Sequence, residues 1–219
     1  MRNYEDSYQH KGLRKQLINL LREKGITDEN VLEAINTIPR HYFLDSAFDK
    51  IAYEDRAFPI SQGQTISQPY TVAYQTQLLQ IKKSDKVLEI GTGSVYQATI
   101  LAELGARVYT IERQKQLFDI QQKEYYFKKQ YPNIKFFFGD GFEGLPTFAP
   151  FDKIIITAAA PFIPPKLVQQ LKVGGMMVIP VDEGDVQRML RLTKLADESI
   201  QEEAFQEFSF VPMLTGKNR

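Results

Sequence analysis

The sequence predicts an α/β fold in which a mostly parallel, seven-stranded sheet carries helices on both faces and follows a helical N-terminal elaboration. Three observations lead to this expectation. From Lys86 onward, short apolar runs alternate with amphipathic segments, as in parallel sheets covered by helices. The first apolar run enters a glycine-rich turn directly. The last two candidate strands follow one another with no helix between them, which is typical of an antiparallel pair at a sheet edge.

Two amphipathic helices are expected before the sheet. The first ends near Gly25 and has apolar residues at helical spacing, namely Leu13, Leu17, Leu20 and Leu21. The second begins at a cap from Thr27 or Asp28 and stops at Pro39. Its predicted inward side chains are Val31, Leu32, Ile35 and Ile38. Residues 40–59 show no clean period, so we expect irregular structure there.

The core is expected to contain seven strands and three helices. The parallel strands are predicted at Lys86 to Ile90, Arg107 to Ile111, Ile134 to Phe138, Lys153 to Thr157 and Met176 to Val181. The helices between them are predicted at Gln97 to Glu103, Gln114 to Lys129 and Lys166 to Leu171. The closing strands are predicted at Arg188 to Leu195 and Glu203 to Val211, joined by a turn at Asp197 to Ser199.

Composition narrows the possible functions. The 219 residues include 27 basic and 27 acidic side chains, so the chain lacks the positive charge that is typical of nucleic-acid binding. It has no Cys and only two His, His10 and His41, and we predict no metal site. No apolar run is long enough to span a membrane, and no secretory signal is apparent. We therefore expect one cytoplasmic domain, with residues 1–60 as the elaboration and 61–219 as the catalytic core.

The segment KVLEIGTGSVY, from Lys86 to Tyr96, indicates a pocket for a nucleoside cofactor. Gly91 and Gly93 let the main chain approach a ligand closely, and Glu89 lies two residues before the first glycine. Glu112 closes the next strand, where a carboxylate can accept hydrogen bonds from a ribose diol. Tyr96 stands where a dinucleotide fingerprint needs glycine, and no Lys followed by Ser or Thr is present. NAD and nucleoside triphosphates are therefore disfavoured.

Six segments, in the same order along the chain, closely resemble the protein-L-isoaspartate O-methyltransferase family. They are GQTISQPYTVAY (Gly63 to Tyr74), VLEIGTGS (Val87 to Ser94), YTIER (Tyr109 to Arg113), GDGFEGLP (Gly139 to Pro146), APFDKIIITAAAPFIPP (Ala149 to Pro165) and LKVGGMMVIPV (Leu171 to Val181). The resemblance implies a Rossmann-like class I methyltransferase fold and S-adenosyl-L-methionine as cofactor. It also implies methylation of the free α-carboxylate of L-isoaspartyl residues in damaged proteins or peptides, as a step in their repair.

The resemblance also assigns site residues. Ser67 matches the family's active-site serine, which orients the substrate carboxylate. Cofactor contacts are expected from Gln64, Thr65, Ile66, Glu89, Gly91, Gly93, Glu112, Asp140 and Gly141. Substrate contacts are expected from Ser67, Thr157, Ala158, Ala159, Val211 and Pro212.

This chemistry suits a chain without Cys and with few His. A carboxylate has a reference pKa near 4, so at neutral pH it is already an anion and needs no general base. The methyl donor is a sulfonium cation, so the main task is to hold an oxygen in line with the methyl carbon. Fixed hydrogen-bond donors would suffice. Beyond Thr157, the segment TAAAP lacks the Asn or Asp and double proline common among enzymes that methylate nucleic-acid amines.

Each of these residues also has a purely structural interpretation. Ser67 could cap a helix that begins at Pro69, and Glu112 could form a surface ion pair. Glu89 could simply be a charge at a strand end. The Asp140–Gly141 pair could close a loop as a turn. The small side chains after Thr157 could serve tight packing.

One position departs from the family pattern. The family usually continues the turn as GTGSGYQ, whereas this chain has Val95 in place of the third glycine. A β-branched residue tolerates a positive φ poorly. We therefore expect either an ordinary φ at Val95 or weak cofactor binding. Two alternatives stay open: a diverged methyltransferase acting on another carboxylate or hydroxyl, and a cofactor-binding protein with little activity. Oligomeric state cannot be predicted from the sequence.

Overall fold

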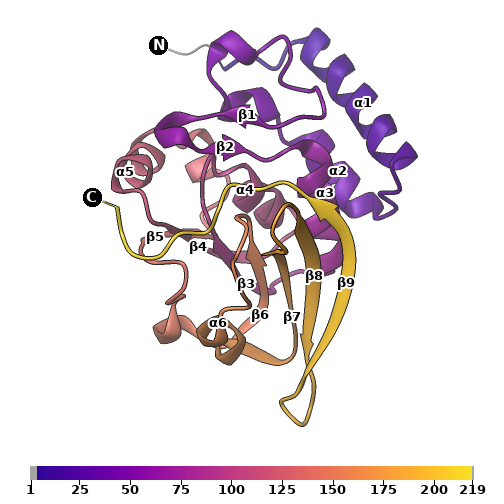
Figure 1. Ribbon diagram of the computed structural model, residues 1–219. Helices are drawn as coiled ribbons and strands as arrows, with labels where there is room; N and C mark the ends of the chain where they lie inside the picture. The colour runs from indigo at the N-terminus through magenta and orange to yellow at the C-terminus, as the bar shows by residue number, and fades with distance from the viewer. Residues whose placement is uncertain (1–3, 219) are drawn as a thin grey trace.

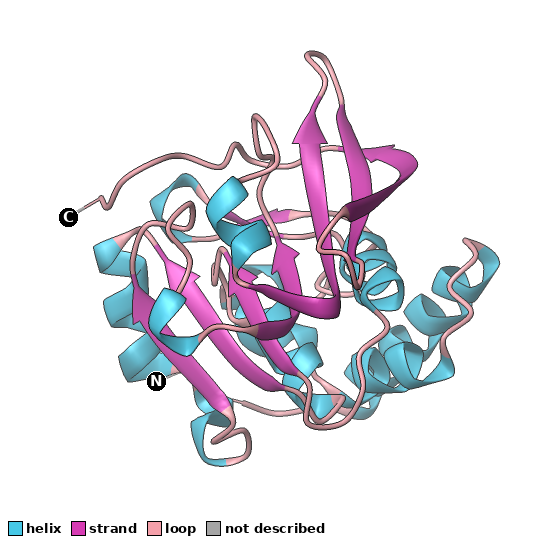
Figure 2. Ribbon diagram, turned by 90° about the horizontal axis from the view of Figure 1, so that it is seen from below, coloured by secondary structure: helices cyan, strands magenta, loops and turns pink. Residues whose placement is uncertain are grey.

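A computed structural model describes residues 4–218, and these contain a seven-stranded sheet in the order β5-β4-β3-β6-β7-β8-β9 (Figures 1 and 2). The first five strands are mutually parallel: β3 (Lys86–Ile90), β4 (Arg107–Glu112), β5 (Ile134–Phe138), β6 (Phe151–Ile156) and β7 (Leu171–Asp182). The last two, β8 (Gln187–Lys194) and β9 (Ile200–Phe208), form an antiparallel ribbon at one edge. The predicted mostly parallel sheet is confirmed.

The two faces of the sheet carry different helices because alternate residues of a strand point to opposite sides. Val87, Val108 and Ile155 belong to the core beneath α3 (Pro69–Leu79) and α4 (Tyr96–Glu103). Their neighbours Leu88 and Tyr109 belong to the opposite core, with Leu167 of α6 (Pro165–Gln169). Helix α5 (Lys115–Glu124) packs along β4 and β5.

The N-terminal elaboration consists of α1 (Tyr8–Glu23) and α2 (Glu29–Thr37), which pack on α3 and α4. The Asp28 carboxylate caps α2 by accepting from the N–H groups of Asn30 and Val31, as the sequence predicts. All four residues predicted to face inward are buried, three of them in α2 and Ile38 at its C-cap. In α1 the prediction is wrong at Leu20, which is 36% exposed, whereas Ile18 is buried. The buried face of α1 is therefore rotated slightly from the face that the spacing of the leucines predicts.

Residues 40–59 contain two short 3-10 helices, Arg40–Phe43 and Ser46–Phe48, and then β1 (Phe58–Pro59). Strand β1 pairs antiparallel with β2 (Thr65–Ile66). Figure 1 shows this small hairpin above the carboxyl ends of β3 and β4. The segment that leads into α3 is thereby held over the edge of the sheet where ligands bind in folds of this kind.

Several predicted boundaries differ from the observed ones. The helix predicted over Gln114 to Lys129 is broken at Tyr125, whose extended ψ of 109° separates α5 from a 3-10 turn. Helix α6 ends at Gln169, and Leu171 already belongs to β7. Strand β7 starts five residues earlier than predicted because Leu171 already pairs with Phe151 of β6, and a register shift separates this pair from the next, Met176 with Lys153. None of the helices in residues 4–218 is long and apolar enough to cross a bilayer.

Candidate functional site

A cavity opens at the carboxyl ends of β3, β4 and β6, where the chain leaves β3 toward β4 on one side and returns to β6 on the other. Ligands in open α/β sheets bind at this switch in strand order. The cavity holds about 860 Å³ of empty space, counting its open mouth. The lining residues come from the β2 region, the glycine turn, the ends of β4 and β6, and the C-terminal segment. They include Gln64, Thr65, Ile66, Ser67, Gly91, Gly93, Glu112, Gly141, Thr157, Ala158, Val211 and Pro212.

Gly91 is required by the close approach of Thr157. The φ of Gly91 is +98°, and a Cβ there would lie 2.6 Å from the Thr157 Oγ1. The Thr157 hydroxyl donates to the carbonyl oxygens of Ile90 and Gly91, at 3.0 and 2.8 Å. The glycine turn and the end of β6 are therefore fixed against each other, with the small Ala158 beside them.

Glu112 lies at the end of β4 with its carboxylate at the cavity wall. It accepts from the N–H of Gly93 at 3.1 Å and from the N–H of Gln114 at 2.9 Å. Burial raises the pKa of the Glu112 carboxyl, and these two N–H groups oppose that rise. Each carboxylate oxygen has a second lone pair, so Glu112 can also accept hydrogen bonds from a diol. The surface ion-pair interpretation is not supported, because Glu112 is only 5% exposed.

Ser67 follows β2 directly and is half-buried at the cavity wall. Helix α3 has Pro69 at its first position, and its N-cap is Gln68 without a side-chain cap bond. The helix-cap interpretation of Ser67 is therefore wrong. Instead the residue lines the same cavity as Thr157 and Gly91.

The C-terminal segment returns across the sheet, as the yellow trace in Figure 1 shows. Four of its residues line the cavity: Val211, Pro212, Met213 and Leu214. Ala159 fixes its start: the Ala159 N–H donates to the carbonyl oxygen of Val211 at 2.8 Å, and Met213 N–H donates to the Ala159 oxygen at 2.7 Å. Near its end, Asn218 N–H donates to the carbonyl oxygen of Arg113 at 2.8 Å. We call residues 211–218 the C-terminal strap.

Three predicted site residues do not line the cavity: Glu89, Asp140 and Ala159. Ala159 acts through its backbone by holding the strap. Asp140 accepts from Phe142 N–H at 2.9 Å and from Gly216 N–H at 2.6 Å, so it fixes both its own turn and the strap. The turn interpretation of Asp140 is thus confirmed, and the adjacent Gly141 does reach the cavity. A Cβ on Gly141 would lie 2.4 Å from the Ile90 Cγ2, which explains the need for glycine there.

Glu89 is fully buried within β3 and is not among the residues that line the cavity. It lies two residues from Val87, so its side chain faces the α4 side of the sheet. Neither carboxylate oxygen has a hydrogen-bond partner among the described residues. Burial raises the pKa of Glu89 to about 8, which makes the neutral acid the main form at pH 7.

Val95 adopts the left-handed conformation, with φ +71° and ψ −1°, so the expectation of an ordinary φ is wrong. Its side chain is buried and lines a second, aromatic cavity between α5 and the N-terminal segment. It does not line the cavity of Gly91 and Glu112. The extra methyl groups therefore do not occupy the space that the glycine turn opens.

Sequence reasoning missed several lining residues. Arg113 and Gln114 follow directly after Glu112, and Met213 and Leu214 extend the strap beyond Pro212. The Arg113 guanidinium donates to the carbonyl oxygens of Thr215 and Gly216 at 3.3 and 3.1 Å. The only sequence signal for these residues is their position next to predicted ones, since the strap meets Arg113 from 102 positions away.

Comparison with known proteins relates the chain to one family. A model of the family Protein-L-isoaspartate(D-aspartate) O-methyltransferase (PCMT) matches residues 12–218. The protein-L-isoaspartate O-methyltransferase of Cytophaga hutchinsonii is 56% identical over 98% of this chain and 96% of its own length. The protein of the same name from Flavobacterium johnsoniae is 55% identical over 98% of this chain and 100% of its own length.

Solved structures have the same fold. One protein-L-isoaspartate O-methyltransferase structure aligns with a TM-score of 0.82 at 25% identity, covering 94% of this chain and 67% of that chain. Another, from Plasmodium falciparum in complex with S-adenosyl-L-homocysteine, aligns with a TM-score of 0.77 at 24% identity, covering 92% and 98%. The predicted class I methyltransferase architecture is confirmed.

Proposed function

The chain belongs to the protein-L-isoaspartate O-methyltransferase family, and on that premise we propose that it transfers a methyl group from S-adenosyl-L-methionine to the free α-carboxylate of L-isoaspartyl residues in damaged proteins or peptides. The observation that carries the proposal is the cavity shared by Ser67, Thr157, Gly91 and Glu112. It unites the predicted acceptor residues and the predicted nucleoside-binding residues in one space. Polypeptide acceptors, rather than nucleic acid, agree with the balanced charge of the chain.

The residues present fit the cofactor. The turn at Gly91 and Gly93 borders the cavity, and Glu112 at the cavity wall offers buried carboxylate oxygens suited to a ribose diol. We propose that Gln64, Thr65, Ile66, Gly93 and Gly141 complete its contacts. When bound, S-adenosyl-L-methionine supplies an electrophilic methyl group on a sulfonium. Neither Glu89 nor Asp140 is included, because their carboxylates lie outside the cavity lining.

The residues of the chain orient the acceptor and do not activate it. A carboxylate acceptor is ionised at neutral pH, and neither His10 nor His41 is among the residues that line the cavity. We propose that the Ser67 hydroxyl donates to this carboxylate, and that Thr157, Ala158, Val211 and Pro212 bound its position. Such orientation can supply roughly 7–11 kcal/mol of the barrier. The side chain of Ser67 acts as a hydrogen-bond donor and forms no covalent bond.

We propose that Val95 leaves the cofactor site open, although its φ of +71° is positive, because its side chain lines the neighbouring cavity and not the one shared by Gly91 and Glu112. We also propose that the N-terminal elaboration and the core form one domain, since α1 and α2 share a single apolar cluster with β3 and β4.

The test is transfer of tritiated methyl from the cofactor to an isoaspartyl peptide, with base-labile incorporation and a silent aspartyl control peptide. Ser67→Ala should lower kcat/KM about 10- to 100-fold, the range expected for a hydrogen bond to a charged group. Affinity for S-adenosyl-L-homocysteine, measured by calorimetry, should stay within about twofold. Ser61→Ala is the matched control, because Ser61 lies outside this cavity. Methylation of the aspartyl control at an equal rate would refute the proposal.

A further inference from the structure

A second cavity lies between α5 and the N-terminal segment, next to the glycine turn. It holds about 1370 Å³ of empty space, counting its open mouth. Among the described residues, only Gly93 and Ser94 line both this space and the reaction cavity. We call the second space the aromatic cavity, because six of its lining residues carry aromatic rings: Tyr4, Tyr42, Phe43, Tyr125, Tyr126 and Phe127. The proposed function does not use it.

The rings of the aromatic cavity hold one another in place. Tyr4 stacks on Tyr126 with the ring centroids 4.3 Å apart, and Tyr42 meets both rings edge-on at 5.0 Å. Tyr42 also stacks on Phe127 at 5.7 Å. Although the rings pack together, the side chain of Tyr126 is still 52% exposed. A concave surface with an exposed aromatic wall is typical of a site for a small organic ligand.

One face of α5 runs along the aromatic cavity. Its residues there are spaced as i, i+3, i+4 and i+7, which places them on one side of a helix: Leu117, Ile120, Gln121 and Glu124. This face is apolar toward the start of α5 and polar at its end. Glu124 is the last residue of the helix, where the helix dipole also favours positive charge. A ligand along this face would place an apolar body over Leu117 and a cationic group beside Glu124.

The charges around the aromatic cavity are all of one sign. The two charged side chains among its described lining residues are the carboxylates of Glu124 and Asp45. The Asp45 Oδ1 accepts from the Ala47 N–H at 2.8 Å, which leaves the Oδ2 available to a ligand. The faces of the surrounding rings carry partial negative charge as well. The cavity therefore favours a cation and disfavours an anion.

Gln121 offers an unused hydrogen-bond acceptor beside these carboxylates. It is 4% exposed, and its Nε2 donates to the carbonyl oxygen of Gly93 at 2.6 Å. Its Oε1 is buried and has no hydrogen-bond partner among the described residues, which is unfavourable unless a ligand or water supplies a donor. The N–H of the same Gly93 donates to Glu112 at 3.1 Å. Gln121 thus connects the aromatic cavity with the wall of the cofactor site.

We propose that the aromatic cavity binds a small primary ammonium ion with an aromatic body, and that its occupancy tightens cofactor binding. The ammonium group pairs with Glu124 and donates to the Gln121 Oε1, while the body lies over Leu117. A donor on this oxygen polarises the amide and strengthens its hydrogen bond to Gly93, which holds the turn beside Glu112. The inference goes beyond the proposed function, because this ion is neither the methyl donor nor the methyl acceptor.

The first experiment titrates the full-length protein by calorimetry with 2-phenylethylammonium and with phenylacetate, an anion of matched size. The ammonium ion should bind with a Kd below about 1 mM, as expected for a ligand of this size, and phenylacetate at least about tenfold more weakly. Equal binding of the two probes, or no binding of either, would overturn the proposal.

The same titration is repeated with saturating S-adenosyl-L-homocysteine, which occupies the reaction cavity. The Kd of the ammonium ion should fall about two- to fivefold, and by linkage the ammonium ion should tighten S-adenosyl-L-homocysteine by the same factor. Competition between the two compounds would place the probe in the reaction cavity and overturn the proposal. An unchanged Kd would overturn the coupling.

The second experiment uses two variants in the aromatic cavity. Glu124→Gln removes the charge and keeps the shape, so the Kd of 2-phenylethylammonium should rise about three- to tenfold. Glu23→Gln is the matched control, because Glu23 is the exposed last residue of α1 and lies outside the cavity. Gln121→Met should still bind the ammonium ion but abolish the effect of S-adenosyl-L-homocysteine on it. Equal effects of Glu124→Gln and Glu23→Gln, or coupling that persists in Gln121→Met, would contradict the proposal.

Discussion

Thr157 donates its side-chain hydroxyl to the carbonyl oxygen of Gly91 across 2.8 Å, which joins the end of β6 to the turn after β3. The Thr157 Oγ1 would lie 2.6 Å from a Cβ at Gly91. The hydrogen bond therefore requires a residue without a side chain at position 91, in the turn that borders the cavity. Because the φ of Gly91 is +98°, a substitution there combines two costs, a strained backbone and a clash.

The first prediction separates these two costs. Gly91→Ala should weaken S-adenosyl-L-homocysteine binding at least tenfold in calorimetry, because the new methyl displaces Thr157 into the cavity. Gly25→Ala is the control, since Gly25 has a φ of +95° with open space around its Cβ position, and it should leave binding unchanged. The double variant Gly91→Ala/Thr157→Ala should recover part of the affinity. If the double variant binds no better than Gly91→Ala, the clash is not the cause.

The second prediction concerns the left-handed residue Val95. In ordinary positions glycine is less stabilising than alanine, by roughly 0.5–1 kcal/mol. At Val95 the order should be reversed, because alanine keeps the strained φ of +71°, worth about 1–2 kcal/mol, and both variants lose the buried side chain. Chemical denaturation should therefore give a lower free energy of unfolding for Val95→Ala than for the wild type or for Val95→Gly. Cofactor affinity should stay within about threefold in both, because Val95 lines the other cavity.

The sequence predicts the sheet well because its signals are local. Apolar runs gave β3 and β5 with their observed ends, and the turn residues gave the strand-to-strand connection before β9. The predicted strand bounds are wrong where residues of unfavourable composition lie in a strand because their neighbours pair with the next strand. Lys172, Gly174 and Gly175 do not have the composition of a strand, yet they lie in β7, between Leu171 and Met176, which both pair with β6.

Site residues are predicted correctly where their position depends only on the end of a strand. Gly91 and Glu112 line the cavity because the carboxyl ends of neighbouring parallel strands meet there. Glu89 was assigned by its distance from the glycines, but its side-chain direction is set by the alternation along β3, which turns it under α4. The role of Asp140 depends on Gly216, 76 positions away, and no local pattern indicates such a contact.

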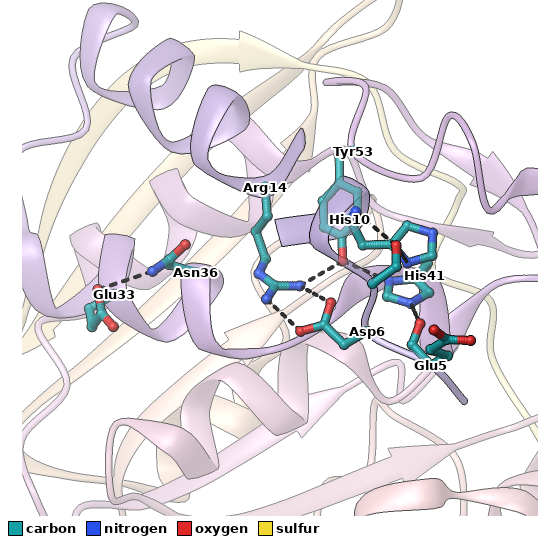
Figure 3. A network of polar contacts seen from close by, with 9 residues as sticks. Glu5, Asp6, His10, Arg14, Glu33, Asn36, His41 and Tyr53 are labelled. Atoms are coloured by element: carbon teal, nitrogen blue, oxygen red, sulfur yellow. Dashed lines mark hydrogen bonds and ion pairs between the residues drawn. The ribbon is translucent and has the colours of Figure 1, made fainter. Parts of the chain in front are cut away.

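The third prediction concerns pH and the polar network of the N-terminal elaboration (Figure 3). The His41 Nε2 lies 3.2 Å from the carbonyl oxygen of Glu5, so this nitrogen carries the proton. The His41 Nδ1 then accepts from the Tyr53 hydroxyl at 2.7 Å, and that hydroxyl accepts from Arg14 at 2.9 Å. Burial lowers the pKa of His41 to about 4, and the stacked ring of His10 adds to this effect.

Because the folded-state pKa of His41 lies below its ordinary value near 6.5, the unfolded chain takes up this proton first as pH falls. The contribution of His41 to stability is therefore complete above about pH 6.5 and is lost progressively toward pH 4. An NMR titration should show His41 neutral at pH 5.5. Tyr53→Phe should raise the pKa of His41, and Tyr8→Phe, at a ring that is 93% exposed, should not. Titration of wild-type His41 near 6.5 would contradict the argument.

The fourth prediction concerns the C-terminal strap as a closure over the cofactor cavity. Val211, Pro212 and Leu214 line the cavity, while the far end of the strap is held by Asp140 and Arg113. Removing one of these hydrogen bonds should favour opening without changing the cavity walls. Asp140→Ala should therefore speed the dissociation of S-adenosyl-L-homocysteine about five- to tenfold, measured by chase of the tritiated compound. Asp197→Ala is the control, because Asp197 accepts backbone and side-chain bonds only within its own turn.

Truncation of the chain after Thr215 distinguishes the strap contact from a direct contact of Asp140 with the cofactor. The truncation removes Gly216, whose N–H donates to Asp140 at 2.6 Å. If Asp140 acts through the strap, the truncated chain should release the product as fast as Asp140→Ala does. Adding Asp140→Ala to the truncation should then change little, because both remove the same interaction. Additive effects would mean that Asp140 touches the cofactor itself, as the family resemblance implies, and that the strap closes the cavity by its apolar residues alone.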